Sequence, residues 1–205
     1  VTNPDVETYR EWGVAPNRSI KEQNPDFITT APNEDQLALM KLMAVFQFTY
    51  VGAPMIYYGE EVGMWGANDP GDRKPMIWDD IEYEDEIYLA EGTKRTQGDK
   101  VEINQDLLVH YKKLIKIRNR HPALQLGDFK TLITDDENGI YAYSRTYENK
   151  TIIVALNKTR KKTLAELKVS GKYRDLLNNS ELVAKNGILN ASINPVGAVV
   201  LLKIE

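Results

Sequence analysis

The chain has 205 residues, of which 42% are hydrophobic and 27% are charged, a composition ordinary for a globular protein. The formal net charge is −4 and no basic stripe is visible, which argues against a nucleic-acid-binding protein. Cysteine is absent, so disulfides, cysteine-based zinc sites and a cysteine nucleophile are excluded. The sequence contains no apolar run of about 18 residues, so we expect no membrane span.

The N-terminal stretch, residues 1–33, is rich in proline, asparagine and aspartate, which is typical of loops. Large apolar side chains such as Tyr9 and Phe27 interrupt it, so we expect a long irregular excursion that packs on a larger body. No signal peptide opens the chain, but Val1 in place of methionine looks like a cut or processed end, so a targeting signal could lie upstream. The sequence leaves the compartment open, with a periplasmic or secreted location slightly favoured over a cytoplasmic one.

The clearest predicted helix covers residues 34–50, with Asn33 as its N-cap and Gly52 just after its end. Its side chains are apolar nearly all round, which is typical of a helix buried among other elements. Residues 53–59 follow as a short apolar and aromatic run, which predicts a strand buried on both faces of a parallel sheet. Because one strand cannot form a sheet alone, we expect the rest of the sheet to precede Val1.

A long acidic loop and a second helix come next. The charge run of residues 79–102 predicts a solvated surface loop, with an acidic protein-binding or cation-binding patch as the alternative. Helical spacing then covers residues 105–120, and Pro122 stops this helix. We place the domain boundary there, so that residues 1–122 form one domain and residues 123–205 the next.

The second domain has the pattern of an antiparallel β-sandwich of about 80 residues, with short strands separated by turn residues. The predicted strand runs are residues 129–134, 140–147, 151–157, 164–169, 192–193 and 198–204.

Two adjacent carboxylates, Glu60 and Glu61, end the predicted strand, and glycoside hydrolysis uses a carboxylate pair. A retaining enzyme needs its two carboxyl groups about 5–5.5 Å apart and facing one sugar. Neighbours on an extended strand point to opposite faces, so these two are poor partners. We expect a structural role for them at the strand end.

A second pair, Asp69 and Arg73, lies four residues apart on the loop that follows. A carboxylate and a planar guanidinium can together hold a sugar ring, whereas the spacing alone favours a simple loop salt bridge. Asn68, Asp69 and Asp72 also suggest calcium, but the glycine and glutamate of an EF-hand loop are not at the required positions, so we expect no metal here.

The remaining candidates are aromatic and histidine side chains. Trp65 and Trp78 flank the loop and, like Trp12, are candidates for stacking on sugar faces, although simple packing is the commoner role of tryptophan. His110 and His121 belong to the predicted second helix or its end, and we expect them to be ordinary helix-surface groups.

Four segments, in this order and spacing, resemble glycoside hydrolase family thirteen, the α-amylase family. Residues 52–64 resemble the eighth strand of its barrel and the exit from that strand. Residues 68–79 resemble the neopullulanase, cyclomaltodextrinase and maltogenic amylase group, residues 114–124 the last barrel helix, and residues 127–129 the entry to the C-terminal β domain. The implied fold is α/β plus all-β: the C-terminal part of a (β/α)8 TIM barrel followed by an antiparallel β-sandwich.

This resemblance implies a retaining mechanism on α-glucosidic bonds. Its carboxylate nucleophile and general acid come from the fourth and fifth strands, and a further aspartate preceded by histidine follows the seventh. None of these motifs occurs in residues 1–205, so we expect no catalytic residue in this chain, no activity of the chain alone, and calcium, if present, only in the missing part. Asp69 and Arg73 match the group's aspartate and arginine that contact sugar at a donor-side subsite, which reverses the preference for a salt bridge.

Two hypotheses follow. In the first, the parent protein acts on α-glucan or maltooligosaccharide substrates, and the rest of the barrel upstream of Val1 completes this chain. In the second, the chain is a non-catalytic carbohydrate-binding or structural module. The long stretch of residues 1–33 departs from short-loop members of the group, so the choice between α-1,4 and α-1,6 linkages stays open. The sequence also does not decide between hydrolysis and transfer, and it does not give the oligomeric state.

Overall fold

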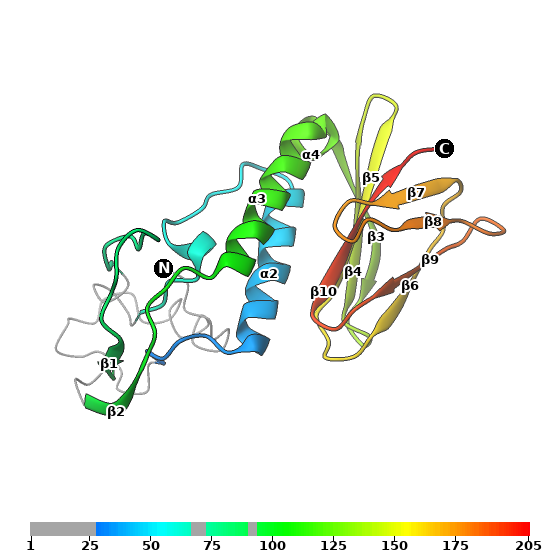
Figure 1. Ribbon diagram of the computed structural model, residues 1–205. Coiled ribbons are helices and arrows are strands. Elements are labelled where there is room, and N and C mark those ends of the chain that lie inside the picture. Colours follow the sequence, from blue (N-terminus) through cyan, green and yellow to red (C-terminus); the bar gives the residue numbers. More distant parts are fainter. Residues whose placement is uncertain (1–27, 67–72, 90–93) are drawn as a thin grey trace, which may run out of the picture. The chain divides into compact units, whose positions relative to one another are not determined.

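A computed structural model describes residues 28–66, 73–89 and 94–205 of the chain (Figure 1). The chain divides into two compact units, one made of Val1–Leu37 and Ile56–His110 and the other of Ala38–Met55 and Tyr111–Glu205. Two of the three breaks between the units fall within long helices, and the third falls between Met55 and Ile56. The expected domain boundary between residues 122 and 123 stays a prediction.

The first helix, α2 (Glu34–Thr49), begins where the capping pattern predicts. The Gln36 N–H donates to Asn33 Oδ1 at 2.9 Å, and the Asn33 N–H donates to Gln36 Oε1 at 2.9 Å. This reciprocal pair satisfies two backbone donors at the helix start. The helix is not buried all round as predicted, because Met43 and Phe46 are exposed.

The segment of residues 53–59 is not a strand, so the prediction of a strand buried on both faces is wrong for this chain. Gly52 takes the predicted positive φ of +102° and turns the chain out of α2. Met55 is then 73% exposed, and Ile56, Tyr57 and Tyr58 are exposed as well. The physical reason is that a strand exists through ladder hydrogen bonds with neighbours, and no strand of the described residues pairs with this segment.

The acidic stretch predicted as a solvated loop contains a small antiparallel sheet of β1 (Glu86–Tyr88) and β2 (Lys94–Asp99). Arg95 holds it together, because its Nη2 donates to the Glu86 carbonyl at 2.6 Å and to Asp99 Oδ2 at 2.7 Å. The same Asp99 carboxylate accepts the Ala31 N–H at 3.0 Å, which attaches the segment before α2 to this sheet. The charges therefore build local structure as well as a polar surface.

A small core lies beside this sheet in the same unit. Val62, Met64 and Ile77 are buried together. The residues that precede position 67 and those that follow position 72 in the sequence therefore contribute to one core. Partly buried side chains pack around the three: Met76, Tyr83, Val101, Ile103 and Leu108.

The second long helix, α3 (Gln105–Arg120), has the predicted bounds. Pro122 does more than stop it, because it begins a new short helix, α4 (Pro122–Leu126), at the first position. Proline suits this position, where its missing N–H would have no partner inside the helix. His121 between the helices is extended, with φ −124° and ψ 95°. Helix α4 then packs on β4 and β5 of the following sheet.

The predicted antiparallel sandwich is confirmed (Figure 1). A six-stranded sheet has the order β3-β4-β5-β10-β7-β8, and β6 pairs with β9 in a second sheet. The strands are β3 (Asp128–Asp135), β4 (Ile140–Tyr147), β5 (Lys150–Asn157), β6 (Thr163–Leu167), β7 (Lys172–Asp175), β8 (Glu181–Val183), β9 (Leu189–Ile193) and β10 (Gly197–Lys203). Two of these, β7 and β8, are too short and polar to show in the sequence pattern.

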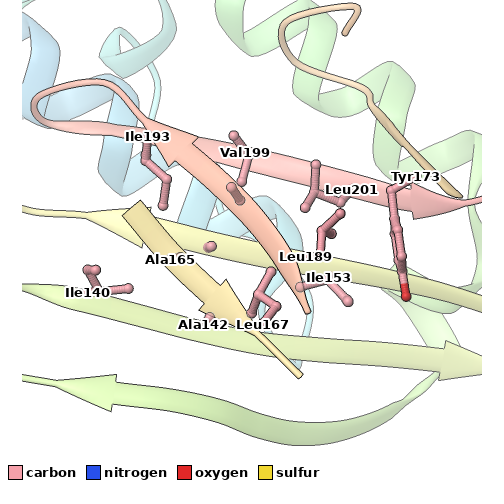
Figure 2. Close-up of a cluster of buried hydrophobic side chains, with 12 residues drawn as sticks. Ile140, Ala142, Ile153, Ala165, Leu167, Tyr173, Leu189, Ile193, Val199 and Leu201 are labelled. Carbon is pink, nitrogen blue, oxygen red and sulfur yellow. The ribbon is translucent and has the colours of Figure 1, made fainter. Parts of the chain in front are cut away.

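The core of this sandwich is a cluster of buried apolar side chains from both sheets. Figure 2 shows Ala165, Leu167 and Leu189 of the small sheet facing Ile153 and Leu201 of the large one. Strand β9 alternates buried and exposed residues along its whole length, as the two-residue period of a strand requires. The β domain therefore has a hydrophobic core of its own.

Candidate substrate-binding site

Of the predicted sugar-binding pair, the structure describes Arg73 alone. Asp69 lies outside the described residues, so its pairing with Arg73 stays a prediction. Arg73 is exposed and takes part in interactions within the chain.

The residues on either side of this loop are held firmly. The Lys74 ammonium forms an ion pair with Glu86 Oε2 at 2.5 Å and lies 5.9 Å from the ring centroid of Trp65. The Tyr58 hydroxyl donates to the Lys74 carbonyl at 2.9 Å. These contacts join Lys74 to residues that precede position 67 in the sequence. Sequence reasoning missed Lys74 and Glu86, because 12 residues separate them and no local pattern relates them.

A half-open cavity of about 260 Å³ lies beside the ends of the loop. Trp65, Pro75, Ile77 and Tyr83 supply its apolar wall, and the Lys74–Glu86 pair supplies charge. The indole N–H of Trp65 is buried and has no acceptor among the described residues. Apolar walls with a few charged groups are the usual composition of a small-molecule site.

The three tryptophans differ in exposure. Trp65 is buried against the cavity, which agrees with simple packing. Trp78 is exposed, and its backbone N–H donates to the Tyr83 hydroxyl at 2.9 Å, so its ring is available to solvent. Trp12 lies outside the described residues.

Glu60 and Glu61 are not neighbours on an extended strand, so the geometric reason for separating them was wrong. They lie in a single 3-10 turn (Glu60–Val62) between Gly59 and Gly63, which both have positive φ. Glu61 Oε2 accepts the Gly59 N–H at 2.9 Å, which fits the structural role expected for it. Burial raises the pKa of the Glu60 carboxyl above its ordinary value.

The two histidines have different surroundings. His110 takes part in interactions within the chain. His121 is partly buried between α3 and α4, where burial and the adjacent Arg120 lower its pKa. Neither belongs to a group of three metal-binding side chains, and the described residues contain no such group. None of the described helices is long and apolar enough to cross a membrane.

The β domain carries a second, polar cavity of about 630 Å³ at the β3–β4 turn. Asp135 and Glu137 line one part of it, and Arg160, Lys161 and Lys162 line another. Hydrogen bonds from the backbone and side chain of Asn138 lower the pKa of Asp135, so this carboxylate is charged at neutral pH. Charged side chains of both signs in its lining suit a polar ligand.

Comparison with known proteins relates both parts of the chain to one family. Residues 23–127 match the family model "Alpha amylase, catalytic domain", and residues 129–200 match "Maltogenic Amylase, C-terminal domain". The chain is 32% identical over 179 residues to neopullulanase 2 of Thermoactinomyces vulgaris, which covers 85% of this chain and 27% of that protein. It is 38% identical over 164 residues to a cyclomaltodextrinase of Thermoanaerobacter pseudethanolicus, which covers 80% of this chain and 24% of that protein.

The similar solved structures are also amylases and a cyclomaltodextrinase. An Anoxybacillus α-amylase matches with a TM-score of 0.66 and 26% identity, over 85% of this chain and 34% of that one. A cyclomaltodextrinase matches with a TM-score of 0.65 and 28% identity, over 86% of this chain and 28% of that one. The chain thus spans about a quarter of the length of the curated relatives named here. Because a catalytic-domain model matches half of its residues and a maltogenic-amylase domain follows directly, the chain belongs to the α-amylase family of glycoside hydrolases.

Proposed function

We propose that the protein to which this chain belongs cleaves α-glucosidic bonds in starch-derived glucans or maltooligosaccharides by a retaining mechanism. The observation that carries the proposal is the catalytic-domain match over residues 23–127, which includes the loop with Asp69 and Arg73. The names of the similar proteins, neopullulanase and cyclomaltodextrinase, point to the same substrate class. In this proposal the carboxylate nucleophile and the general acid lie upstream of Val1.

Asp69 and Arg73 then serve as sugar contacts on the donor side. A carboxylate accepts hydrogen bonds from sugar hydroxyls, and a guanidinium donates to their oxygens. The ion pair of Lys74 with Glu86 supports this role, because it anchors the loop end next to Arg73. Such contacts hold substrate and transition state alike, so their loss should raise KM more than it lowers kcat.

The exposed apolar side chains support the further proposal that this chain functions with the rest of a barrel. Met43 and Phe46 of α2 and Met55 of the following segment are exposed in one unit. Tyr57 and Tyr58 are exposed in the other. Large apolar side chains that are close together in sequence and uncovered mark a surface for association. We propose that preceding barrel strands cover them and pair with residues 53–59.

Two assays test the proposal. Residues 1–205 alone should show no turnover of soluble starch or of a maltoside, and robust turnover would place catalytic groups within this chain. In the protein that includes the upstream part, Asp69→Ala should lower kcat/KM on maltooligosaccharides about 10- to 100-fold. This factor corresponds to the loss of hydrogen bonds to a charged group, which contribute about 1.5–3 kcal/mol. An unchanged kcat/KM would return Asp69 to the salt-bridge interpretation.

The alternative is a non-catalytic carbohydrate-binding or structural module. The separate hydrophobic core of the β domain and its polar cavity favour this possibility. Size-exclusion chromatography and hydrogen exchange on residues 1–205 discriminate between the two. A compact, protected monomer that binds glycans would support the module, whereas association through the uncovered apolar side chains would support the barrel fragment.

A further inference from the structure

The cavity of about 260 Å³ that Trp65 lines lies within one compact unit, the one that contains Ile56–His110. Every residue of its lining belongs to the part of the chain that the structure describes. Segments that are separated in the sequence contribute side chains to a single apolar wall: Met64, Trp65, Pro75, Ile77, Tyr83 and Val101.

The apolar wall of this cavity is part of a packed core. Met64 is 4% exposed and Ile77 is 5% exposed, and both belong to the buried cluster with Val62. Tyr83 and Val101 pack against the same cluster. Side chains that are packed on a core have little freedom to move into an adjacent space, so the cavity is preformed.

Trp65 brings a buried hydrogen-bond donor to the cavity. Its side chain is 6% exposed, and its Nε1 is buried without an acceptor among the residues that the structure describes. An indole N–H can only donate, and a buried tryptophan usually has a partner for it. A buried donor that stays unpaired is unfavourable. Because Trp65 lines the cavity, a molecule bound there can supply the missing acceptor.

A water molecule is a poor partner for this donor. A buried water needs about two to four polar partners, and an apolar wall supplies few of them. Polar groups of the lining already have partners, since the Tyr83 hydroxyl accepts the Trp78 N–H at 2.9 Å and Lys74 pairs with Glu86. An acceptor oxygen on a mainly apolar molecule satisfies the indole N–H and covers the apolar wall at the same time.

The charged groups of the lining favour a neutral ligand. Lys74 Nζ lies 2.5 Å from Glu86 Oε2 and 5.9 Å from the ring centroid of Trp65, so the two charges offset each other within the site. A charged ligand would compete with this pair and would lose its own hydration next to apolar side chains. Glu84, which is exposed, adds one further negative charge and disfavours an anion.

We propose that this cavity binds a small neutral molecule with an apolar ring and one carbonyl or ether oxygen, which accepts the hydrogen bond of the Trp65 indole. Its volume is below the roughly 300–1,000 Å³ of sites for drug-sized ligands, which limits the ligand to one or two rings. A glucosyl unit fits less well, because its many hydroxyls need partners and an apolar wall leaves several of them unpaired. The site therefore serves a ligand class other than the glucans of the proposed function.

Fluorine NMR tests the inference on the protein that includes the upstream part. Its tryptophans are replaced by 5-fluorotryptophan, and the signal that is missing from Trp65→Phe identifies Trp65. Cyclohexanone is the probe, and cyclohexene is the matched molecule with a similar ring and no oxygen. Cyclohexanone should shift the Trp65 signal to saturation and bind about tenfold more tightly than cyclohexene, the factor for a hydrogen bond to a donor that is otherwise unpaired. Equal affinities, or a shift that does not saturate, would overturn the inference.

Two pairs of variants are the controls, with binding measured on the NMR signals of the ligand. Trp65→Phe should weaken cyclohexanone binding about tenfold and leave cyclohexene binding unchanged, whereas Trp78→Phe, at an exposed tryptophan, should change neither. Val101→Phe places a ring in the cavity and should abolish binding, whereas Val183→Phe, at a valine that is 58% exposed, should not affect it. If Trp65→Phe does not fold, Val101→Phe decides, and binding that survives this substitution would refute the site.

Maltose separates this inference from the proposed function. It should not displace cyclohexanone from the protein, because the cavity favours an apolar ligand. Displacement by maltose would assign the cavity to the glucan site, and the inference would then be wrong. If the complete protein bound cyclohexanone as expected but turned over no glucan, the proposed function alone would fail.

Discussion

The contact of Thr49 with Tyr143 allows a prediction in which the two partners are not equivalent. Thr49 Oγ1 lies 2.6 Å from the Val45 carbonyl and 2.6 Å from the Tyr143 hydroxyl. A threonine hydroxyl has one hydrogen, and a carbonyl can only accept, so this hydrogen goes to Val45. The Tyr143 hydroxyl must then be the donor to Thr49.

Thr49→Val and Tyr143→Phe should therefore lower the free energy of unfolding by different amounts. Thr49→Val leaves the Tyr143 hydroxyl buried with no acceptor, and we expect the free energy of unfolding to fall by about 2–3 kcal/mol. Tyr143→Phe leaves Thr49 still bonded to Val45, and the expected loss is about 1 kcal/mol. The double variant should resemble Tyr143→Phe, because no unpaired donor remains. Urea unfolding at constant pH measures the free energy of unfolding of all three variants.

The matched control is Tyr141→Phe, on the same strand and only partly buried, which should change the free energy of unfolding by less than about 0.5 kcal/mol. A Thr49→Val variant that is more stable than Tyr143→Phe would refute the assignment of donor and acceptor. Equal losses in the two single variants, with an additive double variant, would show that the contact carries no coupling.

The pH dependence of the same contact follows from burial, which raises the pKa of Tyr143 above its ordinary value of about 10. Above that pH the unfolded chain releases the phenol proton while the native chain keeps it, so stability must fall as pH rises. The stability that Tyr143 contributes is thus fully present below about pH 10 and is lost at higher pH. The difference between wild type and Tyr143→Phe should be constant from pH 7 to 9 and shrink above 10. If the stability difference between wild type and Tyr143→Phe grew with pH, the expected sign of the pH dependence would be wrong.

Two further predictions concern the core and the loop ends. Leu189→Ala, at a side chain with 0% exposure, should lower the free energy of unfolding by about 2–5 kcal/mol, whereas Leu164→Ala, at 52% exposure, should change it by less than about 1 kcal/mol. If urea unfolding gave equal losses of unfolding free energy for the two variants, Leu189 would not belong to the core. Lys74→Met should cost less than about 1 kcal/mol, because the side chains of Lys74 and Glu86 keep 36% and 24% of their exposure. A loss of several kcal/mol, unaffected by 1 M salt, would show that the pair is effectively buried.

Much of the fold follows from short-range patterns in the sequence. The bounds of α3 and β4 are as predicted, and the capping of α2 by Asn33 is confirmed, because periodicity and capping depend on residues within a few positions of one another. The family could be read from the order of four segments. The sugar-binding role of Asp69 and Arg73 came from the resemblance and not from their spacing, and it stays a prediction.

Only the tertiary structure decided which groups meet across long distances in the chain. The acceptors of Arg145 at Thr49 and Tyr50 are 96 and 95 residues away, so no local pattern marks this arginine as an anchor for α2. The 12-residue separation of Lys74 from Glu86 hides their ion pair in the same way. Residues 53–59 show the converse: their composition predicts a buried strand, yet a strand needs neighbours, and only the structure shows that the described chain supplies none.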